Sequence, residues 1–198
     1  MNNNVNYYNI NCLDYISSSL KLNMDSMVDR FSLYGGLKEG DKVLDAGCGS
    51  GRDSLYMKYD KGFLVSAFDA SQEMVNAIKL STNIDVKVMD FLSFDEFEKY
   101  DGIWCCASLL HVHFDDFEEA LSRLIKSLKS GGILYFSIKQ SEKDVKEWMI
   151  GDRSFYHPGK DKIAEIANRF GLSEIDFFCT GKIGDVSQTF ENYFFKKN

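Results

Sequence analysis

The chain has 198 residues, of which 44% are hydrophobic and 27% are charged, and its formal net charge is -7. This length and composition indicate one soluble globular domain. The acidic balance argues against a nucleic-acid partner, because non-specific affinity for phosphate backbones comes from clustered Lys and Arg. No apolar run approaches the roughly 20 residues of a membrane span, and the first residues, MNNNVNYYN, lack the form of a signal peptide. We therefore expect a cytoplasmic protein without membrane contact.

The five cysteines are an odd number and contain no C-x-x-C pair. They indicate neither a disulfide framework nor a zinc site, so no metal is expected. Cys105 and Cys106 lie in an apolar strand pattern, and we interpret them as small buried residues rather than reactive thiols.

Residues 42–56, KVLDAGCGSGRDSLY, form a strand, a glycine loop and a helix N-terminus. Such a loop lets the backbone approach a ligand, and the first N–H groups of the helix attract polar ligand atoms. The dinucleotide fingerprint G-x-G-x-x-G/A would need Gly or Ala at position 52, where this chain has Arg52, and no G-x-x-x-x-G-K-[ST] loop occurs. Asp45 closes the strand and would repel a phosphate. The pattern therefore favours a cationic ligand or an ammonium group.

The spacing Asp45-x-Gly47-x-Gly49 resembles motif I of the class I S-adenosylmethionine-dependent methyltransferases. The cofactor of that family carries a sulfonium, an α-amino group and a ribose, but no phosphate. The resemblance extends over nearly the whole chain. The stretches GRDSLY at 51–56 and AFDAS at 67–71 are more narrowly similar to small bacterial methyltransferases of the tellurite-resistance type. The resemblance implies S-adenosyl-L-methionine as cofactor and S-adenosyl-L-homocysteine as product.

Apolar periodicity predicts helices and strands in alternation. Residues 1 to about 10 are polar and expected to be frayed, and two short helices broken near Asn23 are expected over 12–34. Strands are expected at 42–45, 63–68, 85–89, 101–106 and 133–138, helices from 51 and at 71–80, 114–129 and 160–170, a charged connection at 141–151, and closing strands at 172–179 and 189–196 joined by a turn at 181–187. The expected fold is α/β, a Rossmann-like seven-stranded, mostly parallel sheet with an antiparallel C-terminal hairpin. In it, residues 1–36 form a helical cover over the cofactor site and 37–198 form the methyltransferase domain.

Asp69 ends the second strand, 22 residues beyond Gly47. This is near the ~20-residue offset at which an acidic side chain accepts hydrogen bonds from ribose hydroxyls. The alternative role for Asp69 is a helix N-cap, although Ser71 could serve as the cap instead. At the end of the third strand, the resemblance implies that Asp90 accepts from the adenine amine. Met89 or Phe91 would pack on the adenine face or simply belong to the core.

A guanidinium from Arg30 or Arg52 could hold the methionyl carboxylate, and Tyr15 matches a position where related enzymes carry a Tyr. Each of these side chains could instead be a solvated helix residue. The complete set of expected cofactor residues is Tyr15, Arg30, Asp45, Ala46, Gly47, Cys48, Gly49, Arg52, Asp69, Ala70, Met74, Met89, Asp90, Phe91, Cys106 and Ala107.

The acceptor is expected beyond the fourth strand, because ligands of open α/β sheets bind at the carboxyl ends of strands. His111 is the candidate general base or acceptor-binding group there, since its ordinary pKa is about 6.5. A lone His is also often structural. The stretch 151–158 resembles an acceptor-pocket insert of related enzymes. Together with Lys139, Arg153, Tyr156 and His157, His111 would make a cationic pocket suited to a carboxylate or a metalloid oxyanion.

The sequence thus predicts a methyltransferase that acts on a small-molecule acceptor as a monomer or homodimer. Two alternatives stay open. A nucleotide-dependent oxidoreductase is disfavoured by the broken fingerprint at Arg52. A non-catalytic S-adenosylmethionine-binding protein is disfavoured because Asp45, Asp69 and Asp90 are all present.

Overall fold

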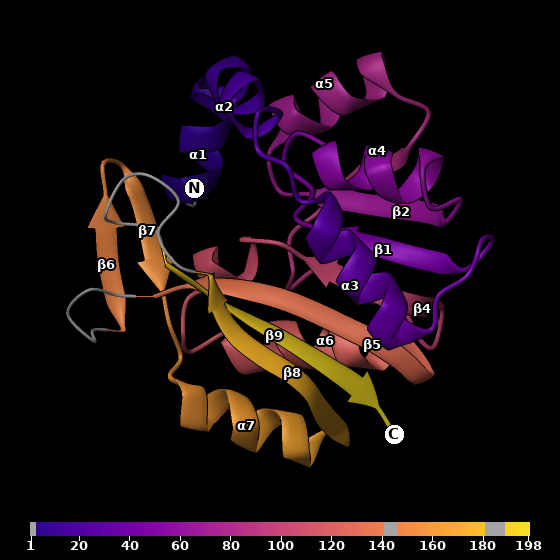
Figure 1. Cartoon of the computed structure of the whole chain (residues 1–198). Coiled ribbons are helices and arrows are strands. Elements are labelled where there is room, and N and C mark those ends of the chain that lie inside the picture. Colours follow the sequence, from indigo (N-terminus) through magenta and orange to yellow (C-terminus); the bar gives the residue numbers. More distant parts are fainter. Residues whose placement is uncertain (1–2, 141–145, 181–188) are drawn as a thin grey trace.

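The computed structural model describes residues 3–140, 146–180 and 189–198 (Figure 1). Its main sheet has seven strands in the order β3-β2-β1-β4-β5-β9-β8. The strands are β1 (Lys42–Ala46), β2 (Leu64–Asp69), β3 (Asp85–Val88), β4 (Tyr100–Cys105), β5 (Leu128–Lys139), β8 (Leu172–Thr180) and β9 (Phe190–Lys197). Strands β1 to β5 are parallel, and β9 lies antiparallel between β5 and β8. The predicted α/β fold with an antiparallel C-terminal hairpin is confirmed, while the turn expected at 181–187 lies outside the described residues.

Helices cover both faces of this sheet (Figure 1). On one face, α3 (Asp25–Gly35), α4 (Arg52–Tyr59) and α5 (Gln72–Ser81) share a buried apolar cluster with the strands. On the other face, α6 (Phe117–Ser127) and α7 (Lys160–Arg169) form a second cluster. Because helices cover both faces, the central strands are buried along most of their length, as residues 43–46 of β1 show.

The first residues form helix α1 (Asn3–Ile10), so the expectation of a frayed segment is wrong from residue 3 onward. Asn4 is buried, and its side-chain amide makes two hydrogen bonds with the backbone of Ser154, at 2.8 and 3.0 Å. Helix α1 is thus attached to the rest of the protein by polar contacts. It lacks the periodic apolar residues from which a sequence pattern predicts a helix. Helix α2 (Cys12–Ser19) follows, and the predicted break near Asn23 before α3 is confirmed.

The expected connection at 141–151 is wrong from residue 147 onward. Strands β6 (Glu147–Ile150) and β7 (Arg153–Tyr156) form a separate antiparallel hairpin, in which Trp148 and Phe155 are cross-strand partners with stacked rings 5.8 Å apart. The helix expected over 114–129 is also too long. The chain enters β5 at Leu128, which pairs with Tyr100 of β4.

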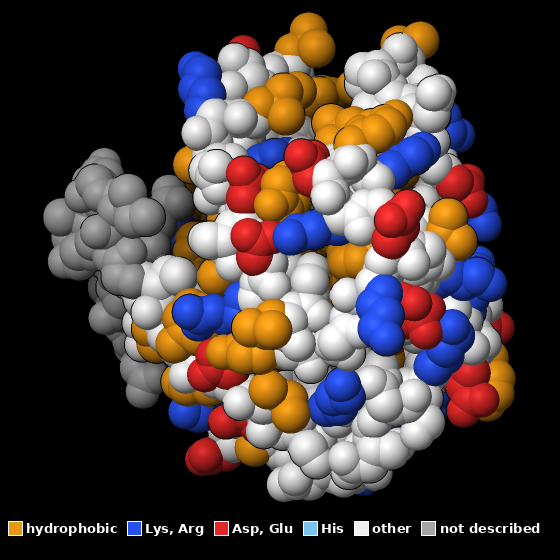
Figure 2. Space-filling model, turned by 45° about the vertical axis from the view of Figure 1, so that its right-hand side comes forward, with side chains coloured by type: hydrophobic (Ala, Val, Ile, Leu, Met, Phe, Trp, Pro, Cys, Tyr) orange, Lys and Arg blue, Asp and Glu red, His pale blue; other side chains and the backbone are white. Residues whose placement is uncertain are grey.

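The face of the molecule shown in Figure 2 is mixed in charge and also carries exposed hydrophobic side chains. On the face shown in Figure 2, Lys and Arg side chains alternate with Asp and Glu side chains, so neither sign dominates that face. Within the described ranges, no helix combines the length and apolar character needed to cross a membrane.

Candidate functional site

A cavity lies at the carboxyl ends of β1, β2 and β4, where α1 and α2 close over the sheet edge (Figure 1). The strand order reverses between β1 and β4, which is where open α/β sheets bind ligands. Most of the expected cofactor residues meet there, together with His111. Those that line the cavity are Tyr15, Asp45, Gly47, Cys48, Gly49, Arg52, Asp69, Ala70, Met74, Met89, Asp90, Phe91, Cys106 and Ala107.

Two of the expected cofactor residues do not line this cavity. Arg30 forms an ion pair with Asp176 at 3.4 Å, and its guanidinium lies 4.5 Å from the ring centre of Phe178. Ala46 is fully buried in β1, and its carbonyl accepts a hydrogen bond from the Ser108 hydroxyl at 2.7 Å. Of the two arginines weighed for the methionyl carboxylate, the structure brings only Arg52 to the cavity.

The backbone of β2 holds the glycine loop in place. The amides of Gly47 and Cys48 both donate to the carbonyl of Phe68, at 2.9 and 3.0 Å. Gly47 has φ +77°, and a Cβ at this position would lie 2.4 Å from the Cβ of Ser108. Both the backbone conformation and the close approach therefore require glycine.

Asp69 supports the loop from the end of β2. Its carboxylate accepts hydrogen bonds from the amides of Gly49 at 2.9 Å and Ser71 at 2.8 Å. Burial raises the pKa of Asp69, and these two backbone bonds oppose the rise. Ser71 is the N-cap of α5, since its hydroxyl accepts from the amide of Met74. A carboxylate has about four lone-pair sites, so two remain for ligand hydroxyls.

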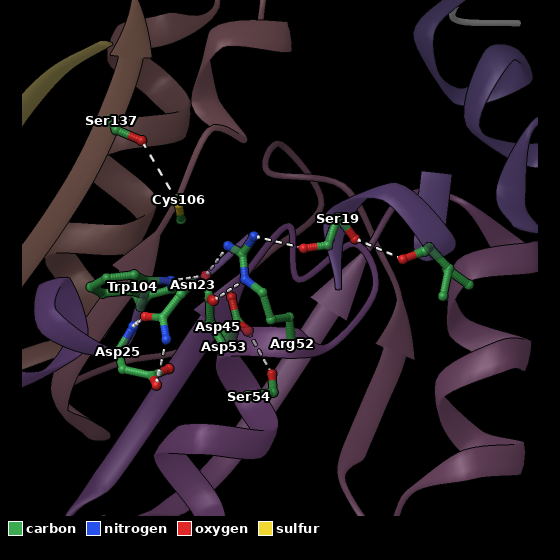
Figure 3. Close-up of polar contacts among 11 residues, drawn as sticks. Ser19, Asn23, Asp25, Asp45, Arg52, Asp53, Ser54, Trp104, Cys106 and Ser137 are labelled. Carbon is green, nitrogen blue, oxygen red and sulfur yellow. Dashed lines mark hydrogen bonds and ion pairs between the residues drawn. The ribbon is translucent and has the colours of Figure 1, made fainter. Parts of the chain in front are cut away.

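Asp45, Arg52 and Asp53 lie close together in a charged cluster (Figure 3). Asp45 is only 2% exposed and accepts a 2.5 Å hydrogen bond from the Ser54 hydroxyl. Burial, and next the nearby carboxylate of Asp53, raise the pKa of Asp45 to about 8. Above the cluster, burial raises the pKa of the Cys106 thiol to about 12, so this cavity-lining sulfur stays neutral.

The cavity lining also includes a hydrogen-bonded pair, Tyr8 and His111. The Tyr8 hydroxyl lies 2.8 Å from Nε2 of His111, and Nδ1 lies 2.9 Å from the carbonyl of Ser154. A carbonyl oxygen only accepts, so Nδ1 carries the proton and Nε2 accepts from the phenol. Burial lowers the pKa of His111 to about 4; the hydrogen bond to the Ser154 backbone opposes this shift, and the charge of Arg153 adds to it. His111 is therefore a neutral ring at physiological pH.

Arg153 lies behind this pair, on β7. Its guanidinium is 5.1 Å from the ring centre of Tyr7 and 5.4 Å from that of Phe155. Its Nε is buried and has no hydrogen-bond partner among the described residues. Burial raises the pKa of Tyr8, whereas the guanidinium of Arg153 lowers it, so the two side chains interact.

Of the expected acceptor residues, His111 lines the cavity, whereas Arg153, Lys139, Tyr156 and His157 are not part of its lining. Lys139 is buried, with its ammonium 5.2 Å from the ring centre of Phe155. Tyr156 packs against the ring of His113, at 5.0 Å between ring centres. His157 pairs with Glu191 at 3.1 Å. Within this group, the charge of Arg153 acts on the pKa of both Tyr8 and His111.

Several cavity residues were not expected from the sequence: Asn4, Val5, Tyr8, Ser19, Ser50, Asp53, Phe68, Ser71 and Ser108. Asp53 carried a usable signal, because it follows Arg52 directly in the GRDSLY stretch. Tyr8 did not, since it lies in a polar segment with no periodic pattern. Among the residues that the structure describes, no group of three His, Cys, Asp or Glu side chains could hold a metal ion.

Residues 43–132 match the model of a family described as a methyltransferase domain. This stretch runs from β1 into β5 and carries the glycine loop, Asp69, Asp90 and His111. It therefore supplies nearly all of the cavity except the part formed by α1 and α2.

Curated relatives support the same assignment at low identity. Over 119 residues, the chain is 29% identical to the ubiquinone biosynthesis O-methyltransferase of Idiomarina loihiensis, covering 57% of this chain and 47% of that one. It is 25% identical over 154 residues to phosphoethanolamine N-methyltransferase 2 of Caenorhabditis elegans, covering 72% and 35%. The chain thus spans about half or less of the length of these two relatives.

Solved structures share the fold. The 1,6-didemethyltoxoflavin-N1-methyltransferase of Burkholderia thailandensis, with its didemethyltoxoflavin and S-adenosylhomocysteine bound, superposes with a TM-score of 0.77 at 17% identity, covering 98% of this chain and 87% of that one. The magnesium protoporphyrin IX methyltransferase of Synechocystis, with S-adenosylmethionine bound, gives a TM-score of 0.74 at 18% identity, covering 98% and 94%. At these identities the likeness shows a common fold.

Proposed function

Because the chain carries a methyltransferase domain of the class I, S-adenosylmethionine-dependent family, we propose that it transfers a methyl group from S-adenosyl-L-methionine to a small acceptor that carries a negative charge. The observation that supports this best is the composition of the cavity. The glycine loop and Asp69 line it together with the hydrogen-bonded pair of Tyr8 and His111. We also propose that the enzyme is cytoplasmic and acts as a monomer or homodimer. In this proposal, residues 1–36 form a helical segment that covers the cofactor site.

The cofactor end fits a nucleoside with an amino-acid tail. Asp69 has lone pairs left for two ribose hydroxyls after holding Gly49 and Ser71. Asp90 lies beyond β3 beside Phe91, whose ring packs edge-on against Phe68. These residues would receive the adenine, and Arg52 would receive the carboxylate.

S-adenosylmethionine supplies a methyl group that its sulfonium already activates. The protein's main task is then to hold the acceptor lone pair in line with that methyl group. Nε2 of His111 is occupied by the Tyr8 phenol, and the ring, with a pKa of about 4, is a weak base. The phenol oxygen of Tyr8 keeps lone pairs that can accept only from an N–H or O–H group elsewhere on the acceptor molecule, not from its anionic atoms. This arrangement supports orientation of an acceptor that needs no strong base, such as a carboxylate, an oxyanion or a thiolate.

The charge at the acceptor end supports an anionic acceptor. With His111 neutral, the guanidinium of Arg153 supplies positive charge beside Tyr8, although Arg153 is not itself part of the cavity lining. Guanidinium groups bind carboxylates and phosphates through paired hydrogen bonds. The nematode relative is named for an acceptor with a phosphate and an amine, in line with this choice.

The test is turnover of S-adenosylmethionine to S-adenosylhomocysteine with paired acceptors, each anion beside its neutral ester or amide. We expect turnover with at least one carboxylate, oxyanion, phosphate or thiol compound and none with its neutral counterpart. Turnover with neutral acceptors alone would contradict the anionic assignment. Binding of NADH without S-adenosylhomocysteine would favour the oxidoreductase alternative, and cofactor binding without any turnover would favour a non-catalytic binding protein.

A further inference from the structure

Arg52 lies on the cavity wall with its guanidinium between two partners, Asp53 and Ser19 (Figure 3). Its Nε and Nη2 donate to the two carboxylate oxygens of Asp53, at 2.6 and 2.9 Å. Its Nη1 donates to the carbonyl of Ser19, at 3.2 Å. A guanidinium has five N–H groups, so these three bonds leave two for a ligand.

Asp53 is held from its other side by the protein core. It is 7% exposed, and its Oδ2 also accepts from the indole Nε1 of Trp104 at 2.9 Å. Trp104 is fully buried, stacked 4.1 Å from Tyr135 and packed edge-on against Phe31. The indole therefore has little freedom to move, and it fixes the Asp53 carboxylate in one orientation.

The chain of contacts from Trp104 through Asp53 to Arg52 presents a guanidinium edge to the cavity. Asp53 takes the edge formed by Nε and Nη2, which leaves N–H groups on the terminal nitrogens. The partner there is the neutral Ser19 carbonyl, which forms a longer bond than Asp53 does. A carboxylate is the ligand that matches a planar guanidinium edge best.

Resting on the proposed function, we infer that Asp53 and Trp104 are positioning residues that orient Arg52 to bind the α-carboxylate of the cofactor. Neither residue needs to touch the cofactor tail for this role. The consequence is selectivity among nucleosides. Trp104, Asp53 and Arg52 together raise the affinity for ligands with the amino-acid tail, but not for 5′-methylthioadenosine, which lacks that tail.

A purely structural role makes a different prediction. Arg52 and Asp53 are adjacent in the first turn of α4, and their ion pair could serve only to stabilise that helix. Loss of Asp53 would then weaken every nucleoside equally by loosening the glycine loop. Comparing two ligands that share the nucleoside and differ in the tail separates the two roles.

The experiment is calorimetric titration of the full chain with S-adenosylhomocysteine and with 5′-methylthioadenosine. We expect Asp53→Asn to weaken S-adenosylhomocysteine binding by about 10-fold or more, as for loss of charge-assisted hydrogen bonds, and 5′-methylthioadenosine binding by less than about 2-fold. Trp104→Phe should show the same selectivity with a smaller loss. Asp60→Asn, which changes an exposed acid at the end of the same helix, should alter neither.

Equal weakening of both ligands by Asp53→Asn, or unchanged binding of both, would overturn the inference. Asp53→Glu keeps the charge and should recover part of the selectivity, so a general folding defect can be told apart from a lost orientation. If the unaltered chain binds neither ligand, the proposed function itself fails, and this inference fails with it. If the unaltered chain binds both ligands and Arg52→Lys leaves the ratio of their affinities unchanged, only the inference is overturned.

Discussion

The Tyr8 hydroxyl and Nε2 of His111 form a 2.8 Å hydrogen bond between residues 103 positions apart. Tyr8 belongs to α1, whereas His111 ends the short 3-10 helix η1 (Leu109–His111) that follows β4 at the cavity. The other ring nitrogen of His111 bonds to Ser154 of β7, whose backbone also pairs with Asn4 of α1. The helix over the cavity and the acceptor end are thus parts of one hydrogen-bonded unit.

Tyr8→Phe removes the hydroxyl while keeping the ring in its edge-on contact with Tyr15. We expect kcat with an acceptor found in the screen to fall by about 10- to 100-fold, because the acceptor loses an orienting partner. Affinity for S-adenosylhomocysteine should stay within about 2-fold of the original. Tyr59→Phe, at a side chain 60% exposed, is the control. Unchanged turnover would assign Tyr8 a purely structural role.

Asn4→Ala removes both hydrogen bonds between α1 and β7. Each bond contributes about 0.5 to 1.5 kcal/mol, so we expect the free energy of unfolding to drop by about 1 to 3 kcal/mol. Release of S-adenosylhomocysteine in stopped-flow measurements should also become faster, because α1 contributes part of the cavity wall. Asn3→Ala, at the exposed neighbour, is the control. Equal release rates in both variants would show that α1 does not retain the cofactor.

Asp69→Ala tests the ribose assignment. Hydrogen bonds to a charged group contribute about 1.5 to 3 kcal/mol, and we expect a loss of cofactor affinity in that range. Because Asp69 also holds the Gly49 amide, thermal stability must be measured beside affinity. Asp85→Ala, at an exposed acid that begins β3, should change neither quantity. Full affinity in a folded Asp69→Ala chain would remove the assignment.

That the glycine loop, Asp69 and Asp90 line one cavity could be predicted because this information is local in sequence. The glycine loop joins β1 to α4 directly, and Asp69 ends the very next strand, so a fixed offset between them places both at one sheet edge. The position of Asp90 at the same sheet edge is predicted in the same way, because Asp90 follows the next parallel strand, β3. Here the parallel topology converts spacing along the chain into proximity in space.

The rest of the site depends on contacts between distant segments. Arg30 and Arg52 are equivalent candidates in sequence, and only the position of Asp176 in β8 shows why Arg30 faces away from the cavity. Tyr8 was missed because α1 is held by side-chain amides such as Asn4, which leave no apolar period to detect. The hairpin containing Arg153 was missed because it depends on one cross-strand pair of aromatic rings.

Stability should decrease between pH 6.5 and 8 because of Asp45. Its pKa is raised from 3.8 to about 8, so within that window the folded chain holds one proton more than the unfolded chain. The free energy of unfolding then falls by up to about 1.4 kcal/mol per pH unit. His111 acts in the opposite direction between about pH 4 and its ordinary 6.5, because its lowered pKa leaves the folded chain with one proton fewer.

The two slopes oppose each other below pH 6.5, so the net decrease becomes visible only above that value. Urea unfolding at pH 5, 6.5 and 8 should give nearly equal free energies at the first two values and a lower one at the third. Asp45→Asn cannot ionise and should abolish the decrease above pH 6.5, while His111→Asn should leave it in place and make the decrease begin at a lower pH. An identical decrease in the original chain and in Asp45→Asn would mean that another group causes it and that Asp45 is ionised in the folded protein.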